Sequence, residues 1–304
     1  MDARPIGVFD SGLGGLTTVK KLIECLPGED IIYLGDTGRV PYGSRSRETI
    51  IKYARQDAAF LAGFDIKAMV IACNSASSVA YGILKDTYNM PVYNVINEPA
   101  DAAAAITKNG KVGVIGTTAT IRSGVYEAAL KLIKPDLRIT SVSCPLFVPL
   151  VENGRTAGDD RAALTIAEDY LAPLREEGID TLILGCTHYP LLRDVILNIL
   201  SSGVTLIDSG AETAKLVAGD LMERGLLSES RLACCAGDSQ ANAADASAYS
   251  GSAGIESENM ETRLSGAEAA VRYFVTDSAE GFSELASRFL EMDVRGMVEQ
   301  ITLE

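Results

Sequence analysis

The segments "IKAMVIACNSAS" (66–77) and "IDTLILGCTHYP" (179–190) follow one pattern, in which an apolar run leads through a small residue to a cysteine and then to polar residues. Apolar runs of this length are typical of buried strands. A second pair, "IGVFDSG" (6–12) and "VGVIGTT" (112–118), repeats at nearly the same offset. Two repeats in register indicate that the chain consists of two related halves.

Further apolar runs alternate with longer stretches in which apolar residues recur every three or four positions, as in Ile51, Ala54, Ala58 and Leu61. These runs are "DIIYLGD" (30–36), "PVYNVI" (91–96), "LRITSV" (137–142) and "VTLID" (204–208). Buried strands that alternate with helices predict an α/β fold. Together with the duplication, they predict two pseudo-symmetric domains, each a mostly parallel sheet flanked by helices.

The overall composition narrows the class of function. The 304 residues carry a formal net charge of -14, which argues against nucleic acid or an anionic membrane as the main partner, because both require a basic surface. No apolar run reaches the roughly 18 to 20 residues of a membrane helix, and the first ten residues lack a signal-peptide pattern. We therefore expect a cytoplasmic protein.

The cysteines and the histidine set limits on disulfide and metal chemistry. Six cysteines, at positions 25, 73, 144, 186, 234 and 235, are too sparse for a disulfide scaffold and are expected to be thiols. The sequence contains one histidine, His188, and neither a CxxC nor an HExxH pattern. A zinc site would have to consist mostly of carboxylates, so no metal site is predicted.

Polar residues follow the predicted strands at their carboxyl ends, where open α/β sheets bind ligands, often at helix N-termini. They are Asp10, Ser11, Cys73, Asn74, Thr117, Thr118, Cys186, Thr187 and His188. We expect these residues to line one cleft between the two halves.

Cys73 and Cys186 differ from the other cysteines because their context is matched in the two halves. A thiol between a strand and a helix is placed where amide donors and the helix dipole favour the thiolate. Two facing thiols are compatible with a disulfide switch, a metal pair, a nucleophile with a resolving partner, or an acid and a base on opposite faces of one carbon. The last chemistry uses the duplication best, since inverting a stereocentre by proton exchange requires a group on each face.

Six motifs, in order along nearly the whole chain except about 233–270, closely resemble the glutamate racemases of the cofactor-independent aspartate/glutamate racemase family. They are "GVFDSGLGGLTTV" (7–19), "YLGDTGRVPYGSRS" (33–46), "IACNSAS" (71–77), "GVIGTTATIRSGVY" (113–126), "PLFVPLVENG" (145–154) and "LGCTHYPLL" (184–192). The resemblance implies interconversion of L- and D-glutamate without a cofactor, supplying D-glutamate for peptidoglycan precursors. It also implies a homodimer, and a site between two domains formed by residues 1–97 with 208–304 and by residues 98–207.

The same resemblance assigns catalytic roles. Cys73 is expected to remove the Cα proton of D-glutamate, and Cys186 that of L-glutamate. His188 would assist Cys186, because an imidazole can stabilise a thiolate or shuttle its proton near neutral pH. Asp10 is the matching assistant beside Cys73, and Glu152 is a further candidate beside Cys186 and His188.

Substrate binding falls, by resemblance, to residues that offer backbone amides, hydroxyls and a side-chain amide rather than a cation. They are Asp10, Ser11, Tyr42, Gly43, Asn74, Ser75, Thr118, Thr187 and His188. Neutral dipoles in a desolvated site can support the negative charge that develops at Cα. Ser75 departs from the family, which usually has threonine there, so a hydroxyl is kept and a methyl contact is lost.

Other readings stay open at this point. An aspartate racemase of the same family would keep both thiols and differ in pocket depth, whereas a non-catalytic amino-acid-binding module would not need them. A redox-switched protein would join Cys73 and Cys186 in a disulfide. The Ala-, Ser-, Gly- and Asn-rich segment at about 233–270 predicts a surface insertion with no assigned function.

Overall fold

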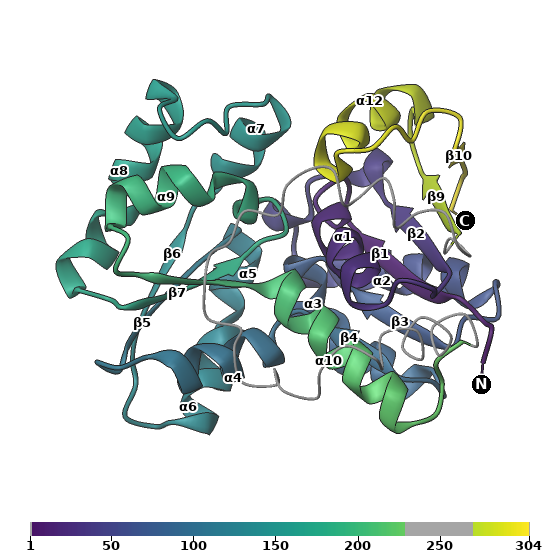
Figure 1. Ribbon diagram of the computed structural model, residues 1–304, viewed down its shortest axis with the longest axis horizontal. Helices are drawn as coiled ribbons and strands as arrows, with labels where there is room; N and C mark the ends of the chain where they lie inside the picture. The colour runs from purple at the N-terminus through teal and green to yellow at the C-terminus, as the bar shows by residue number, and fades with distance from the viewer. Residues whose placement is uncertain (1, 229–269, 304) are drawn as a thin grey trace, which may run out of the picture.

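The computed structural model describes residues 2–228 and 270–303, and its strands form two separate sheets. The first sheet has the order β10-β9-β2-β1-β3-β4, the second has the order β6-β5-β7-β8, and neighbouring strands are parallel throughout. Figure 1 shows the two sheets in two lobes, with both chain ends on the lobe of the first sheet. The predicted α/β fold with parallel sheets flanked by helices is confirmed. The predicted insertion at 233–270 lies outside the described residues, apart from Ala270.

The bounds of the strands match the apolar runs of the sequence closely. The first sheet contains β1 (Ile6–Asp10), β2 (Ile31–Gly35), β3 (Ala68–Ile71), β4 (Val92–Asn94), β9 (Val271–Val275) and β10 (Val298–Gln300). The second contains β5 (Lys111–Gly116), β6 (Arg138–Ser143), β7 (Thr181–Gly185) and β8 (Thr205–Asp208).

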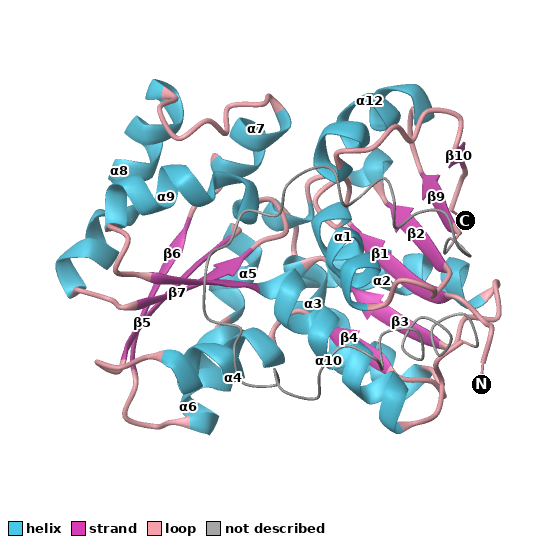
Figure 2. Cartoon of the chain, viewed as in Figure 1, coloured by secondary structure: helices cyan, strands magenta, loops and turns pink. Residues whose placement is uncertain are grey.

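Helices connect these strands and cover the sheets (Figure 2). The α-helices are α1 (Leu16–Cys25), α2 (Arg47–Ala62), α3 (Asn74–Thr87), α4 (Asn97–Ile106), α5 (Thr118–Ser123), α6 (Val125–Ile133), α7 (Phe147–Glu152), α8 (Arg161–Glu177), α9 (Arg193–Leu200), α10 (Ser209–Glu223) and α12 (Ala279–Leu290). Three short 3-10 helices are η1 (Thr37–Arg39), η2 (Tyr42–Ser44) and η3 (Tyr189–Leu192).

The strands are apolar on both faces because helices pack on both sides of each sheet. In β7, Leu184 packs in one cluster with Leu171 of α8, whereas its neighbour Ile183 packs in another with Ala103 of α4 and Leu130 of α6. In β1 the corresponding partners are α1 on one face and α2 with α3 on the other. Burial of alternate side chains in opposite directions therefore explains the continuous apolar runs in the sequence.

The duplication in the sequence is reproduced in the order of the strands. β1 pairs with β2 on one side and β3 on the other, and β5 pairs in the same way with β6 and β7. β4 and β8 then extend the two sheets beyond β3 and β7. Cys73 and Cys186 consequently follow equivalent strands, each next to the strand that carries the other repeated segment.

Candidate active site

The segments after β1, β3, β5 and β7 open on one cavity of about 360 Å³. Its wall consists of Ser11, Gly12, Val40, Pro41, Tyr42, Gly43, Ser44, Cys73, Asn74, Ser75, Thr117, Thr118, Pro145, Val148, Pro149, Glu152, Cys186, Thr187 and His188. These wall residues include no lysine and no arginine. The cavity contains both predicted thiols and every other predicted site residue except Asp10, so residues from both sheets meet at one site.

Cys73 lies at the start of α3 and is nearly buried. Its sulfur accepts a hydrogen bond from the backbone N–H of Ala76, at 3.4 Å, as the N-cap of the helix. The thiol in turn donates to the hydroxyl oxygen of Ser11, at 3.6 Å. Burial and the nearby Asp10 carboxylate raise the pKa of Cys73 to about 12. Cys73 is therefore a protonated thiol, able to donate a proton, at neutral pH.

Asp10 ends β1 and is almost completely buried. One carboxylate oxygen accepts a hydrogen bond from the backbone N–H of Gly12, at 2.9 Å. The other, Oδ1, is buried and has no hydrogen-bond partner among the described residues. Burial raises the pKa of Asp10, while the nearby His188 opposes this rise. A buried acceptor without a partner is available to a ligand or to a proton.

Cys186 follows β7, and His188 and Glu152 extend from it as a chain of hydrogen bonds. The His188 Nδ1 atom lies 3.9 Å from the Cys186 sulfur, and His188 Nε2 lies 3.1 Å from Glu152 Oε1. Burial alone would lower the pKa of His188, but the hydrogen bonds to Cys186 and Glu152 outweigh it and raise the pKa to about 10. His188 is therefore an imidazolium at neutral pH, and a cation beside a sulfur stabilises its thiolate form.

The first lobe packs tightly against the segment that carries Cys186 and His188. A Cβ atom on Gly14 would lie 2.1 Å from Thr187 Oγ1 and 2.5 Å from His188 Nδ1, so no larger residue fits there. The hydroxyl of Thr17 donates to the carbonyl of Thr187, at 2.9 Å. From the other side, the ring of Phe289 in α12 meets the imidazole edge to face, with centroids 5.9 Å apart. These contacts fix the imidazole.

Tyr42 lies in the cavity wall, and its hydroxyl is directed to a buried acidic cluster. The side chain is fully buried, and its hydroxyl is hydrogen-bonded to the carboxylates of Asp36 and Asp57. Arg39 donates to both carboxylates, at 2.6 and 2.9 Å. This buried cluster anchors η2 against the cavity. A Cβ on the following Gly43 would lie 2.7 Å from Thr117 Cβ, so the loop approaches the second lobe closely.

Hydroxyl groups from the two lobes meet across the cavity. Ser75 Oγ of the first lobe lies 2.9 Å from Thr117 Oγ1 of the second, whereas Thr118 Oγ1 lies 2.9 Å from Ser143 Oγ within the second lobe. Asn74 is buried, and its side-chain oxygen has no hydrogen-bond partner within the part of the chain that the structure describes. Apart from the imidazolium of His188, the cavity thus offers hydroxyl donors and an unpaired acceptor rather than cationic side chains.

Several residues of the wall are not predicted from the sequence. Val40, Pro41, Pro145, Val148 and Pro149 give it an apolar side, although they lie within the motifs quoted for the resemblance. Their apolar character gave no chemical signal, and only their place beside Tyr42 or Glu152 could have indicated them. Thr117 was noted as a strand-end residue but was not assigned to binding; it caps α5 and hydrogen-bonds Ser75.

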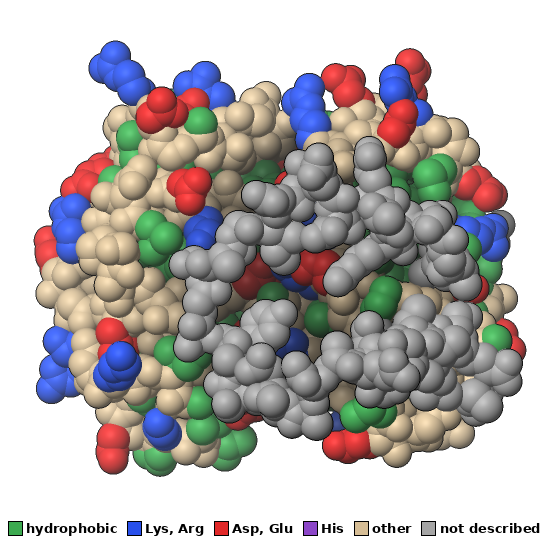
Figure 3. All heavy atoms as spheres, in the orientation of Figure 1, with side chains coloured by type: hydrophobic (Ala, Val, Ile, Leu, Met, Phe, Trp, Pro, Cys, Tyr) green, Lys and Arg blue, Asp and Glu red, His purple; other side chains and the backbone are tan. Residues whose placement is uncertain are grey.

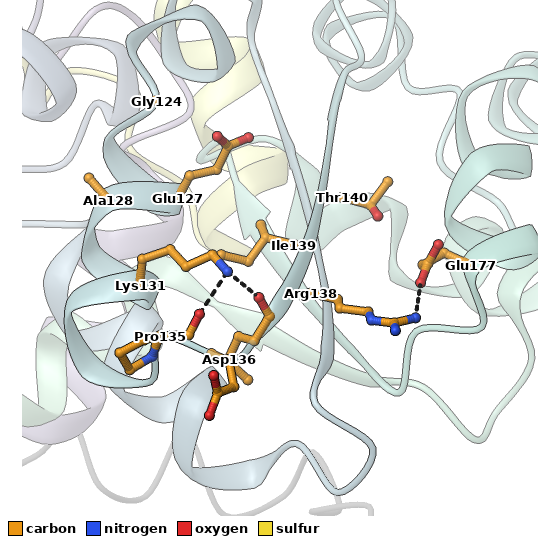
Figure 4. A pocket seen from close by; sticks show the side chains of 11 residues that line it. Gly124, Glu127, Ala128, Lys131, Pro135, Asp136, Arg138, Ile139, Thr140 and Glu177 are labelled. Carbon is orange, nitrogen blue, oxygen red and sulfur yellow. Dashed lines mark hydrogen bonds and ion pairs between the residues drawn. The ribbon is translucent and has the colours of Figure 1, made fainter.

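A larger hollow, of about 800 Å³, lies elsewhere, beside the edge strand β6 (Figure 4). Its Lys131 donates to the carbonyls of Pro135 and Leu137, and Arg138 lies 4.0 Å from Glu177, so these cations interact within the wall. Its wall contains no cysteine and no histidine. Size alone therefore does not select the site, whereas the chemistry of the side chains does.

Residues 2–228 and 270–303 show neither a metal-binding cluster nor a membrane-spanning helix. Within them no group of three or more His, Cys, Asp or Glu side chains is placed to hold a metal ion. No helix there is long and apolar enough to span a membrane. On the face drawn in Figure 3, the acidic and basic side chains of the described residues are interspersed over both lobes and do not gather into a basic patch.

Two buried thiols at equivalent strand ends open on one cavity, an arrangement suited to proton exchange on both faces of a carbon. Comparison with known proteins agrees with this class. The family model described as Asp/Glu/Hydantoin racemase matches residues 6–217. The protein belongs to this family.

Individual relatives match over the whole chain. The glutamate racemase of Geobacter metallireducens is 43% identical over 304 residues, which cover 100% of this chain and 98% of that protein. Among solved structures, glutamate racemase isoform RacE1 of Bacillus anthracis matches with a TM-score of 0.84 at 35% identity, covering 100% of this chain and 99% of the other. The Francisella tularensis glutamate racemase, solved in complex with D-glutamate, gives a TM-score of 0.82 at 35% identity, again covering 100% and 99%.

Proposed function

We propose that the protein is a cofactor-independent glutamate racemase that interconverts L- and D-glutamate by a two-base mechanism. The observation that carries the proposal is the presence of Cys73 and Cys186 in the wall of one cavity, after equivalent strands of the two sheets. The identity of 43% to a glutamate racemase over the whole chain supports glutamate over aspartate as the substrate.

In the direction from L- to D-glutamate, the thiolate of Cys186 takes the Cα proton, and the bonding electrons move to Cα and its carboxylate. The Cys73 thiol then gives its proton to the opposite face of Cα. This leaves Cys186 as a thiol and Cys73 as a thiolate, so both must exchange protons before the next turnover. His188 and Asp10 serve this exchange, and the reverse reaction uses the same groups in exchanged roles.

The protonation states found around the two thiols suit this starting point. The raised pKa of Cys73, about 12, keeps it ready to donate, and the raised pKa of His188, about 10, keeps an imidazolium next to Cys186. Glu152 holds that imidazolium through its hydrogen bond to Nε2. The resting protein is thus prepared to accept L-glutamate, whereas D-glutamate requires prior removal of the Cys73 proton, for which Asp10 is the nearby base.

Substrate binding is proposed to use the neutral groups of the wall together with the unpaired acceptors. The Oδ1 atoms of Asp10 and Asn74 are suited to the α-ammonium group of the substrate, because both are buried acceptors that no described residue pairs. The two carboxylates are proposed to bind to donors at the strand ends and helix starts. These are the hydroxyls and backbone amides of Ser11, Tyr42, Gly43, Ser75, Thr118, Thr187 and His188.

We also propose the cellular role and the division of the chain. D-glutamate made by this reaction would supply peptidoglycan precursors, in the cytoplasm and from a homodimer. The two domains would comprise residues 1–97 with 208–304, and residues 98–207. The change of sheet between β4 and β5, and again between β8 and β9, supports this division.

The test is a chiral assay of the purified protein, stripped of small molecules, with L-glutamate and L-aspartate in parallel. We expect the optical rotation of L-glutamate to fall to zero while L-aspartate changes little. Faster loss of rotation for L-aspartate would assign the protein to the aspartate branch of the family. Binding of glutamate without any loss of rotation would leave only the non-catalytic binding module.

A further inference from the structure

The side-chain amide of Asn74, the residue after Cys73, is held in one orientation. Its nitrogen Nδ2 lies 2.9 Å from the hydroxyl oxygen of Tyr126 and 3.4 Å from the carbonyl oxygen of Val95. A carbonyl only accepts hydrogen bonds, so the atom that faces it must be the nitrogen. The oxygen Oδ1 therefore lies on the other side of the amide, where it is buried and has no partner in residues 2–228 and 270–303.

The hydroxyl of Tyr126 is set to accept from Asn74. It donates its single proton to the carbonyl of Val95, at 2.9 Å, and burial raises its pKa, so that proton is retained. Ser209 Oγ lies 3.1 Å away but uses its own proton on the carbonyl of Leu184, at 2.7 Å. The lone pairs of the tyrosine oxygen are consequently left for the Asn74 amide.

Tyr126 lies on α6 of the second lobe, and its hydroxyl contacts three segments that are far apart in the sequence. Asn74 begins α3 of the first lobe, Val95 follows β4, and Ser209 begins α10. The chain leaves the first sheet after β4 and leaves the second sheet after β8, immediately before α10. The buried Tyr126 hydroxyl therefore links the two segments that connect the lobes to Asn74, the residue that follows the proposed catalytic Cys73.

We propose that Tyr126 is a positioning residue that orients the Asn74 amide so that Oδ1, and not the NH₂ group, is offered to the α-ammonium group of the substrate. The inference rests on the proposed function and adds to it a determinant of how the amino acid is recognised. If the amide rotated by half a turn, its NH₂ donors would face an ammonium group that is itself only a donor. Such a site would reject the substrate, although both thiols would be unchanged.

The experiment compares Tyr126→Phe with Tyr93→Phe as a matched control. Tyr93, on β4, is also buried, and neither tyrosine belongs to the cavity wall, but the Tyr93 hydroxyl donates to Asp220, at 2.5 Å, and not to a group beside the thiols. In Tyr126→Phe we expect the KM for L- and D-glutamate to rise about tenfold while kcat changes less than about threefold, because one oriented hydrogen bond is lost. Tyr93→Phe should match the unaltered protein. Equal KM values in both variants would overturn the inference.

A double-mutant cycle separates positioning from a general structural role. If Tyr126 acts through Asn74, adding Tyr126→Phe to Asn74→Ala should raise KM less than about twofold further, because no amide remains to orient. A second tenfold rise in the Asn74→Ala background would contradict the inference even if the single variant behaves as expected. Where turnover is too slow, binding of D-glutamate by equilibrium dialysis replaces KM.

The experiments distinguish a failure of the proposed function from a failure of the role given to Tyr126. If the unaltered protein neither racemises nor binds glutamate, the proposed function is wrong and the inference falls with it. If the unaltered protein is active and the tyrosine variants do not differ, only the role of Tyr126 is wrong. Thermal unfolding of each variant, compared with Tyr93→Phe, shows whether a change in KM accompanies a loss of stability.

Discussion

The two strand ends that carry the thiols share a backbone arrangement and differ in what surrounds the sulfur. Cys73 caps the 14-residue helix α3, and its neighbours are a serine hydroxyl and a buried carboxylate. Cys186 precedes the four-residue 3-10 helix η3 and lies beside an imidazole held by Glu152. One thiol is kept protonated, whereas the other has a cation beside it.

The different surroundings of Cys73 and Cys186 show how a duplicated fold can give two equivalent thiols different properties. Repetition of strand and turn places an equivalent group on each side of a cavity, but two identical environments would give both thiols the same protonation state. Asp10 on one side and His188 on the other remove that equivalence. Under the proposed mechanism one thiol then serves as the acid and the other as the base, as inversion of a stereocentre requires.

Replacement of either thiol should have the largest effect on activity and tests whether both sides of the site are needed. Cys73→Ser and Cys186→Ser should each reduce racemisation of glutamate by about 10³-fold or more, because an alcohol does not replace a thiol as a proton carrier near neutral pH. Chiral chromatography of the product measures the loss. Cys25→Ser is the control, since that cysteine lies outside the cavity wall, and it should keep full activity. Full turnover in either active-site variant would refute the two-base account.

Gly14→Ala tests the contact that joins the first lobe to the His188 side. Because the added Cβ would lie 2.1 Å from Thr187 Oγ1 and 2.5 Å from His188 Nδ1, the segment must move, and a shift near 1 Å costs about 100-fold in rate. Steady-state kinetics provides the measurement. Gly82→Ala is the control, since nothing lies within 4 Å of its added Cβ. Equal rates for the two alanine variants would show that the close contact is unimportant.

The two assistants should affect the two directions differently. His188→Asn is expected to lower kcat from L- to D-glutamate by roughly tens of fold and more than the reverse kcat, and Asp10→Asn should do the opposite. L- and D-glutamate have equal free energies, so kcat/KM must fall equally in both directions and the asymmetry appears in kcat. Full progress curves from each isomer measure it. The same asymmetry in both variants would mean that the assistants do not serve separate thiols.

Glu152→Gln should have the smallest effect. The Glu152 carboxylate raises the pKa of His188, so its removal lowers that pKa and the imidazolium is lost at a lower pH. The alkaline limb of kcat for L-glutamate should therefore move to lower pH, with less than about a tenfold loss at pH 7. A pH–rate profile from pH 6 to 10.5 checks the direction. An alkaline limb that stays at the same pH, or moves to higher pH, would exclude Glu152 as the partner of His188 in catalysis.

The sequence allowed the fold and the two thiols to be predicted for physical reasons. Strands buried on both faces must be apolar throughout, so β3 and β7 were visible as runs, and the matched cysteines followed directly from them. The strand-end pattern already indicated Asp10, and the resemblance to the family added its role beside Cys73. The resemblance also added Glu152, whose place near the thiols no local pattern indicates.

Other parts of the site depend on contacts between residues far apart in the sequence. Tyr126 lies 52 positions from Asn74, and nothing in its helix shows which group its hydroxyl meets. The burial of Tyr42 against Asp36 and Asp57 is similar, because a tyrosine after a proline is equally typical of a surface turn. The role of Gly14 emerges only when the two lobes are placed together.

The central claim, that two thiols act on opposite faces of Cα, is tested most directly by the early reaction of L-glutamate in deuterated water. Mass spectrometry of the separated isomers, within the first few per cent of conversion, reads the label. The account predicts that the D-glutamate formed carries one deuterium at Cα while the remaining L-glutamate carries almost none. D-glutamate that retains the original proton, returned by a single group, would contradict it.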